Sequence, residues 1–252
     1  MYESLGLAEK RMLVAGASSG IGRKTAELLA EMHAKVVMVA RRKEKLNEVL
    51  QNLDYTGHSY YVADLAELEK IDGLIKQIVS EQGPLDGVVY CCGIDGSRPV
   101  SMSKPAFVDQ MMKVNFLGFY ELVRCLTKRG RFNEGLSIVG LSSCAVLSGT
   151  KSQSVYCATK AAMDAAVRVM AQEYAEKGIR VNTVRPGMIK TDMYEHLIDK
   201  VGEEYNKGLF EQQFLGLGET EDVANMIAFL LSPAAKFVTG AHFAVDGGNT
   251  CH

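Results

Sequence analysis

The chain has 252 residues, of which 47% are hydrophobic and 23% charged, and its formal net charge at pH 7 is -2. This near-neutral balance provides no basic face for nucleic acid, and the apolar runs fall short of the roughly 20 residues of a membrane span. The six cysteines include no C-x-x-C pair, so the composition predicts no metal site and fits a cytoplasmic protein without nucleic-acid or membrane partners.

Short β-branched runs alternate along the chain with longer segments of helical period. Strands are expected at 11–15, 35–40, 58–62, 86–91, 135–141, 179–184 and 242–245. Helices are expected at 21–32, 43–51, 65–82, 107–127, 154–175, 192–212 and 221–231. This alternation predicts an α/β Rossmann fold, a doubly wound parallel sheet of about seven strands with helices on both faces. We expect 1–252 to form a single domain, in which 191–218 is either a substrate lid or an ordinary pair of surface helices.

The first predicted strand runs directly into a glycine-rich loop. Glycines at such a place let the backbone turn sharply and approach a pyrophosphate held over the N-terminus of the next helix. The spacing is G-x-x-x-G-x-G rather than the common G-x-G-x-x-G, so the position between strand and helix carries the argument. The predicted dinucleotide contacts are Gly16, Ser18, Ser19, Gly20, Ile21 and Gly22.

The second strand ends at Ala40, which is followed by Arg41 and Arg42. An NAD site usually has an acidic residue here, which accepts a hydrogen bond from the ribose 2′-hydroxyl. Two guanidinium groups instead suit a 2′-phosphate, which predicts NADP(H) as the cofactor. The alternative is that both arginines only begin a solvated, charged helix.

Asp64 and Leu65 follow the third strand, where a sheet of this order places the adenine ring. We include both among the expected cofactor contacts. The Asp64 carboxylate either accepts from the adenine amine or caps the helix that starts near Ala66.

Tyr156 and Lys160 lie four residues apart, on one face of a predicted helix. A cation there would stabilise the phenolate and lower the Tyr156 pKa toward neutrality, which suits a general acid or base. Ser143 ends the fifth strand, and strand C-termini meet at the site of a doubly wound sheet. Its hydroxyl is expected to hold the substrate oxygen beside Tyr156, whereas the neighbouring Ser142 is expected to be structural.

These residues and their order resemble those of the short-chain dehydrogenase/reductase family, and the resemblance covers nearly the whole chain. Further matching segments are Val114-Asn115-Phe116-Leu117-Gly118, Pro186-Gly187-Met188-Ile189-Lys190-Thr191 and Val245-Asp246-Gly247-Gly248. Within the family, the pattern is most similar to that of the 3-oxoacyl-(acyl carrier protein) reductases.

The resemblance implies a role for each matching residue. Tyr156 would be the general acid/base, Lys160 its pKa-lowering partner and a ligand of the nicotinamide ribose, and Ser143 the group that orients the carbonyl. Asn115 would bend its helix to hold a proton-relay water. The nicotinamide pocket would be formed by Pro186, Gly187, Ile189 and Thr191.

The segment after the fourth strand departs from the family pattern. Where the family usually has Asn-Asn-Ala-Gly, this chain has Cys91-Cys92-Gly93-Ile94 by our comparison. We still expect Cys92 and Gly93 to border the cofactor, with loss of a structural hydrogen bond rather than of activity. The alternative interpretation of the adjacent cysteines is a redox or metal feature.

The leading hypothesis is an NADPH-dependent reductase of a 3-oxoacyl thioester that forms a homotetramer, as family members typically do. Acyl carrier protein is a candidate partner through the basic residues Lys128, Arg129, Arg131 and Lys177, which equally suit a solvated helix end. The alternatives are a family member acting on a steroid, sugar or polyketide-like alcohol, a non-catalytic NADP(H) sensor, and a structural subunit.

Overall fold

The computed structural model describes residues 5–54, 56–201 and 212–251. Within these residues, seven strands form one parallel sheet in the order β3-β2-β1-β4-β5-β6-β7. The strands are β1 (Arg11–Ala15), β2 (Lys35–Ala40), β3 (Ser59–Val62), β4 (Leu85–Tyr90), β5 (Phe132–Leu141), β6 (Arg180–Pro186) and β7 (His242–Val245). The predicted α/β fold with a doubly wound parallel sheet is confirmed.

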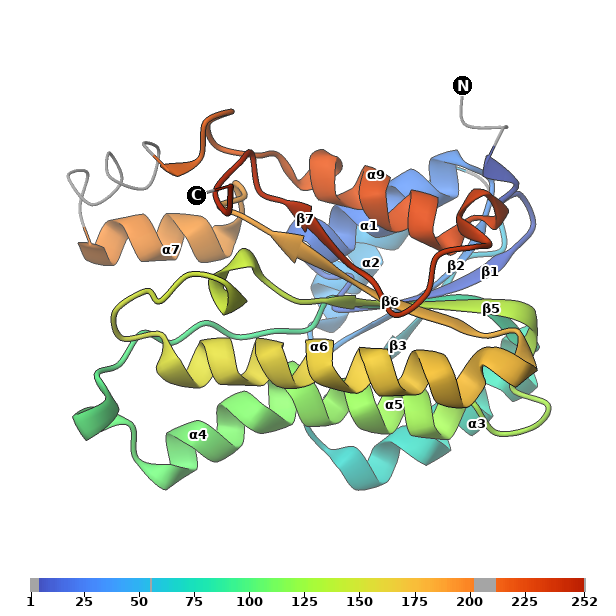
Figure 1. Ribbon diagram of the computed structural model, residues 1–252. Coiled ribbons are helices and arrows are strands. Elements are labelled where there is room, and N and C mark those ends of the chain that lie inside the picture. The colour runs from blue at the N-terminus through green and yellow to red at the C-terminus, as the bar shows by residue number, and fades with distance from the viewer. Residues whose placement is uncertain (1–4, 55, 202–211, 252) are drawn as a thin grey trace.

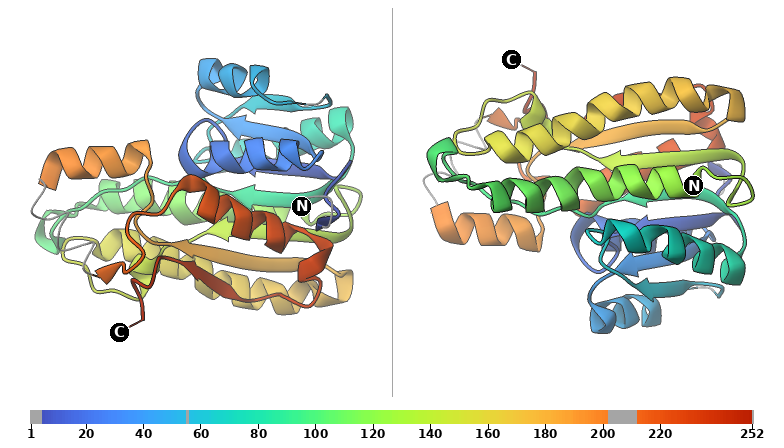
Figure 2. Two further views of the ribbon diagram at one scale, coloured as in Figure 1. Left: turned by 90° about the horizontal axis from the view of Figure 1, so that it is seen from above. Right: turned by 90° about the horizontal axis from the view of Figure 1, so that it is seen from below.

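Helices cover both faces of the sheet (Figures 1 and 2). One face carries α1 (Gly20–Glu31), α2 (Lys43–Gln51) and α9 (Thr220–Leu231). The other carries α3 (Ile71–Gln82), α5 (Gly118–Leu126) and α6 (Ser154–Tyr174). Two more helices are α4 (Pro105–Met112), which leads into α5, and α7 (Asp192–Val201), which lies beyond the end of the sheet. Of the helix predicted at 192–212, residues 202–211 lie outside the described residues.

The strand sequences explain why both faces of the sheet are buried. β2 reads Lys-Val-Val-Met-Val-Ala, and all but its first residue are buried. Val36 and Met38 pack into the core under α1 and α9, while Val37 and Val39 pack into the core under α3, α5 and α6. A continuous apolar strand is what a parallel sheet with two covered faces requires.

The structure corrects two of the predicted helices. The segment at 65–82 begins with turns rather than a helix, since the Asp64 carboxylate accepts from the Ala66 amide at 2.9 Å and a 3₁₀ turn follows at Leu68–Lys70. The segment at 107–127 is continuous but not uniformly α-helical, because a π-helical turn at Lys113–Leu117 joins α4 to α5.

The helix lengths and the cysteine thiols bear on two of the predictions from composition. No helix in the described ranges has the length and apolarity needed to cross a membrane. All six cysteines fall within the described ranges, and each has a free thiol.

The close contact between α6 and the sheet depends on Gly140 of β5. A Cβ built on Gly140 would lie 2.7 Å from Sδ of Met163 on α6 and 3.4 Å from the ring of Phe119 on α5. Met163 and Phe119 are fully buried, so neither can move aside without disturbing the core. Gly140 thus lets α6, the helix that carries Tyr156 and Lys160, lie directly on the sheet.

We expect Gly140→Ala to lower the free energy of unfolding by about 1–3 kcal/mol, because the added methyl overpacks the α5–α6 layer. Gly73→Ala is the matched control, since Gly73 lies in α3 with no atom within 4 Å of its would-be Cβ. This control should be neutral or stabilise the helix by up to about 1 kcal/mol. Urea unfolding followed by circular dichroism measures both variants, and equal stabilities would contradict the prediction.

Candidate active site

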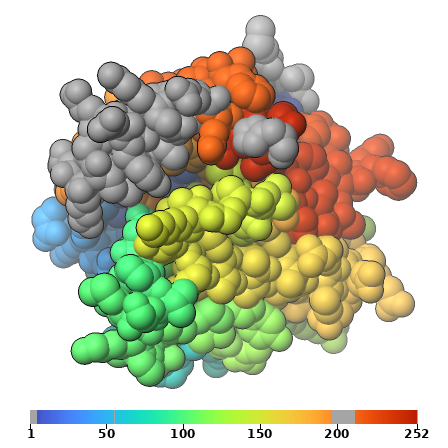
Figure 3. All heavy atoms as spheres, turned by 60° about the vertical axis from the view of Figure 1, so that its left-hand side comes forward, coloured from blue at the N-terminus to red at the C-terminus, as the bar shows by residue number. Residues whose placement is uncertain are grey.

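A cleft of about 380 Å³ opens at the edge of the sheet where the strands end. Figure 3 brings this edge forward, with the segment after β5 (yellow-green) beside α6 (yellow). Parallel strands bring their carboxyl ends to one edge, so segments far apart in the chain meet here. Every predicted site residue lines the cleft except Asn115, which is fully buried behind its wall.

The glycine-rich loop lies between β1 and α1, as predicted. Gly16 and Gly20 have φ values of 87° and 54°, in the left-handed region that favours glycine. A Cβ on Gly16 would lie 2.9 Å from backbone atoms of Cys91 and Cys92, so only glycine allows this approach to the end of β4. The first residues of α1 face the cleft, where their free N–H groups suit a phosphate.

The two arginines after β2 have different partners. Arg42 Nη2 donates to the Ser19 and Ser18 hydroxyls at 2.7 and 3.0 Å, so its guanidinium folds back onto the glycine-rich loop. Arg41 Nη1 lies 3.5 Å from Asp64 Oδ2. The other oxygen of Asp64 accepts from the Ala66 amide and closes a turn, so Asp64 does not cap a helix starting at Ala66, because the first helical turn begins at Leu68. Because Arg42 contacts the glycine-rich loop, its role is not limited to beginning a solvated helix.

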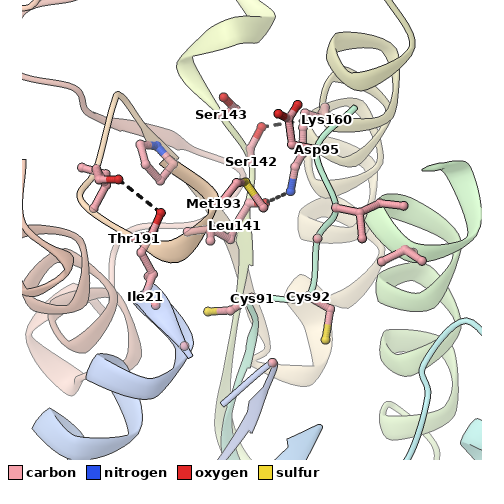
Figure 4. Close-up of a pocket in the computed structure, with 18 of the residues that line it drawn as sticks. Ile21, Cys91, Cys92, Asp95, Leu141, Ser142, Ser143, Lys160, Thr191 and Met193 are labelled. Carbon is pink, nitrogen blue, oxygen red and sulfur yellow. Dashed lines mark hydrogen bonds between the residues drawn. The ribbon is translucent and has the colours of Figure 1, made fainter. Parts of the chain in front are cut away.

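The first turns of α6 carry Tyr156 and Lys160, both of which line the cleft, and Figure 4 shows Lys160 at the end of β5. Lys160 Nζ donates to the Leu141 carbonyl at 2.6 Å and lies 5.8 Å from the centroid of the Tyr156 ring. Ser143 and Tyr156 line the cleft together, and the Ser143 hydroxyl favours the ionised form of Tyr156. The Ser142 hydroxyl donates to the Lys160 carbonyl at 3.4 Å and is almost fully buried, in accord with its predicted structural role.

Burial shifts the pKa values of Tyr156 and Lys160 in opposite directions. It raises the Tyr156 pKa well above its usual value, and the Ser143 hydroxyl opposes this only in part. It lowers the Lys160 pKa to about 8. Our expectation that the Tyr156 pKa is lowered toward neutrality is therefore wrong, because the surrounding protein raises it. The lysine charge is directed at the Leu141 carbonyl, and loss of water penalises the phenolate more strongly.

Asn115 joins two walls of the cleft from behind. Its Nδ2 donates to the Ile94 carbonyl at 3.0 Å and the Thr159 hydroxyl at 3.1 Å, and its Oδ1 accepts from the Ile94 amide at 2.8 Å. The helix irregularity expected at Asn115 is present as the π-helical turn. Both amide hydrogens are in use, so only Oδ1 has a lone pair left for a water.

The segment after β4 carries the adjacent cysteines, whose sulfur atoms point to opposite sides of the chain (Figure 4). β4 ends at Tyr90, one residue before the predicted end. Matching Gly93 to the glycine of Asn-Asn-Ala-Gly without a gap places Tyr90 and Cys91 on the asparagines, which corrects our comparison by one residue. Burial raises the Cys92 pKa to about 12 and also raises that of Cys91, so both are neutral thiols at physiological pH.

The structure adds residues that were not among the individually predicted site residues. Gln213 is 2% exposed, and its amide accepts from the Met188 N–H at 2.8 Å and donates to the Met188 carbonyl at 3.0 Å. Gln213 thereby fixes Met188, in the segment after β6, to a part of the chain 25 residues later. No local sequence pattern predicts such a contact. Asp95, Gln153 and Asn249 also line the cleft.

Comparison with known proteins shows similarity along nearly the whole chain. A family model described as Enoyl-(Acyl carrier protein) reductase matches residues 16–250. The 3-oxoacyl-(acyl-carrier-protein) reductase FabG of Staphylococcus aureus is 34% identical over 242 residues, which cover 95% of this chain and 97% of the relative. A short-chain type dehydrogenase/reductase from Mycobacterium ulcerans has a TM-score of 0.89 at 31% identity, covering 98% of this chain and 91% of that one. A blue fluorescent protein from a metagenomic library, in complex with NADPH, has a TM-score of 0.87 at 28% identity, covering 96% and 98%.

The raised pKa values predict that Cys91 and Cys92 react slowly with iodoacetamide at pH 7.5, because only the thiolate is nucleophilic. Exposed Cys251 is the internal control and should be alkylated at least about tenfold faster in the native protein. Mass spectrometry of the peptides measures each rate. Alkylation of Cys92 as fast as that of Cys251 would support the redox interpretation instead.

Proposed function

This chain belongs to the short-chain dehydrogenase/reductase family of oxidoreductases, and from that premise we propose that it reduces a ketone to a secondary alcohol with NADPH, or catalyses the reverse oxidation. The observation that carries the proposal is that Ser143, Tyr156 and Lys160 lie in one cleft with the glycine-rich loop. A 3-oxoacyl thioester is the first substrate we propose, because a relative named for that activity is 34% identical to this chain.

Each of the three side chains has a distinct part in the proposed reaction. A bound reduced nicotinamide supplies the hydride to the ketone carbon. Ser143 holds the ketone oxygen next to Tyr156. Since burial keeps Tyr156 neutral, its phenol donates the proton to that oxygen as negative charge develops there. Lys160 is largely protonated at pH 7, because its pKa is about 8, and its charge offsets only part of the cost that burial imposes on the phenolate left behind.

The cofactor contacts proposed from the sequence fit the walls of the cleft. The glycines let the loop lie against the end of β4, and the start of α1 faces the part of the cleft where a pyrophosphate would bind. Lys160 keeps two further N–H groups for ribose hydroxyls, and a relay water would bind beside Asn115. The adenosine end is assigned to Asp64, Leu65, Cys92 and Gly93, and the nicotinamide end to Pro186, Gly187, Ile189 and Thr191.

The preference for NADPH over NADH rests on the end of β2. Ala40 leaves no carboxylate to accept from a ribose 2′-hydroxyl, and Arg42 holds its guanidinium against Ser18 and Ser19 at the same edge of the cleft. A planar fork of N–H groups suits a phosphate dianion. Arg41, paired with Asp64, is the second arginine assigned to this end.

We also propose a cytoplasmic homotetramer, with a substrate lid formed by 191–218. Ala158, Ala161 and Ala165 are exposed on α6, and Val169 on the same helix is 55% exposed. Small and apolar residues on an exposed helix allow a second helix to approach closely. Six free thiols fit the reducing cytoplasm. Thr191 and Met193 line the cleft at the start of the proposed lid.

Two of the basic residues proposed to bind a carrier protein, Lys128 and Arg131, do not lie near the cleft. Lys128 Nζ and Arg131 Nη1 pair with Asp72 at 2.7 and 2.8 Å, ahead of β5 at the edge where strands begin. A carrier protein bound there would be at the opposite end of the sheet from the cleft of the same chain. The carrier-protein partner therefore rests on the relatives alone.

A second candidate substrate, a hydroxylated ketone of the sugar type, is favoured by polar groups in the cleft. Asp95 lines it near Tyr156, and among the described residues no cation is paired with this carboxylate. The amides of Gln153 and Asn249 line the cleft as well. These groups would accept hydrogen bonds from, and donate them to, substrate hydroxyls.

The proposal is tested by NADPH oxidation with acetoacetyl-CoA and, in parallel, with dihydroxyacetone as a hydroxylated ketone. We expect Tyr156→Phe to lower kcat by about 10²–10⁴-fold while NADPH binding, followed by fluorescence, is retained. The control is Tyr61→Phe, which removes from β3 a hydroxyl that donates to Glu81 of α3. Turnover of dihydroxyacetone alone would favour the second candidate, and NADPH binding without turnover of any ketone would favour a sensor.

Arg42→Ala is expected to weaken NADPH binding by about 10–100-fold, because charge-assisted hydrogen bonds to the 2′-phosphate are lost. NADH binding should change little. Lys43→Ala removes the same charge one residue later, outside the cleft, and is the control. Equal losses for both cofactors in a fluorescence titration would show that Arg42 does not read the 2′-phosphate.

A further inference from the structure

Tyr90 is a buried polar residue that the proposed reaction does not use. It is the last residue of β4, is 0% exposed, and its ring meets that of Phe119 edge-on at a centroid distance of 5.7 Å. Its hydroxyl donates to the Val114 carbonyl at 2.7 Å. This bond links the central sheet to the π-helical turn between α4 and α5.

The π-helical turn explains why the Val114 carbonyl accepts from a side chain. The Gly118 amide donates to the Lys113 carbonyl, five residues back. A regular α-helix would direct that amide to Val114, four residues back. The turn thus takes the helical donor away from the partly buried Val114 carbonyl, and the Tyr90 hydroxyl donates there instead.

The space for this hydroxyl depends on Gly118. A Cβ on Gly118 would collide with the Tyr90 hydroxyl and lie 2.6 Å from the Leu65 carbonyl. Glycine at 118 and tyrosine at 90 therefore fit each other, and both contact the irregular turn.

The residue after Val114 is Asn115, which connects the two walls of the cleft. It holds Ile94 by both backbone groups and Thr159 by its hydroxyl, and the Thr159 hydroxyl donates to the Tyr156 carbonyl at 2.7 Å. One residue turns an α-helix by about 100°. Closing the π-helical turn into a regular helix would therefore rotate Asn115 out of this position.

We propose that Tyr90 is a positioning residue for the reduction assigned above, on which this inference rests. Its hydroxyl fixes the π-helical turn, the turn fixes Asn115, and Asn115 fixes the segment after β4 against the turn of α6 that carries Tyr156. Tyr90 itself touches no reacting atom in this scheme.

The test compares Tyr90→Phe with Tyr61→Phe, each of which removes one tyrosine hydroxyl bonded within the fold. Both are measured at a temperature where circular dichroism shows them folded. We expect Tyr90→Phe to lower kcat about tenfold while the KM for NADPH changes by less than about twofold. Hydrogen–deuterium exchange should become faster at the Ile94 amide and across 113–118. Tyr61→Phe should change neither kcat nor exchange at these sites.

The two readouts separate this inference from the proposed function. Faster exchange with unchanged kcat would mean that the hydroxyl is only structural, and unchanged exchange would mean that it does not hold the turn; either overturns the proposal. A similar loss of kcat in both variants would also overturn it. If the wild type reduces no ketone, the proposed function fails by itself, and exchange at Ile94 still decides whether Tyr90 fixes Asn115.

Discussion

The reversal of strand order between β1 and β4 is the constraint on which the other features depend. β1 pairs with β2 on one side and β4 on the other, and the chain extends the sheet outward from both. The loops after β1 and β4 therefore diverge and leave a crevice at their carboxyl ends. At its base, Gly16 meets the backbone of Cys91 and Cys92 so closely that a Cβ would not fit.

Burial then determines the charges inside this crevice before any ligand arrives. It favours the neutral form of both Tyr156 and Lys160, which raises one pKa and lowers the other. A neutral phenol can donate a proton, and the Lys160 amine beside it is still largely protonated at pH 7. The arrangement depends on the end of β5, because the Leu141 carbonyl accepts from Lys160 and Ser143 lines the cleft with Tyr156.

Local patterns predicted the fold well because parallel strands leave a strong local signal. Continuous apolar runs such as β2 have identical predicted and observed bounds. The errors fall where a side chain competes with regular backbone bonding. Asp64 closes a turn where a helix was predicted, and the Tyr90 hydroxyl replaces a helical donor at Val114. Such competition depends on atoms from other elements, which no window of sequence contains.

The sequence by itself determined the alternation of strands and helices, the glycine-rich loop and the Tyr156–Lys160 spacing, because each is set by neighbours within a few residues. Only the tertiary structure decided that Arg42 folds onto the loop, that Gln213 holds Met188 and that Asn115 ties Ile94 to α6. It also reversed the expected direction of the Tyr156 pKa. The physical reason is the same in each case. Hydrogen-bond partners and loss of water are properties of the assembled interior, where residues distant in the chain come together.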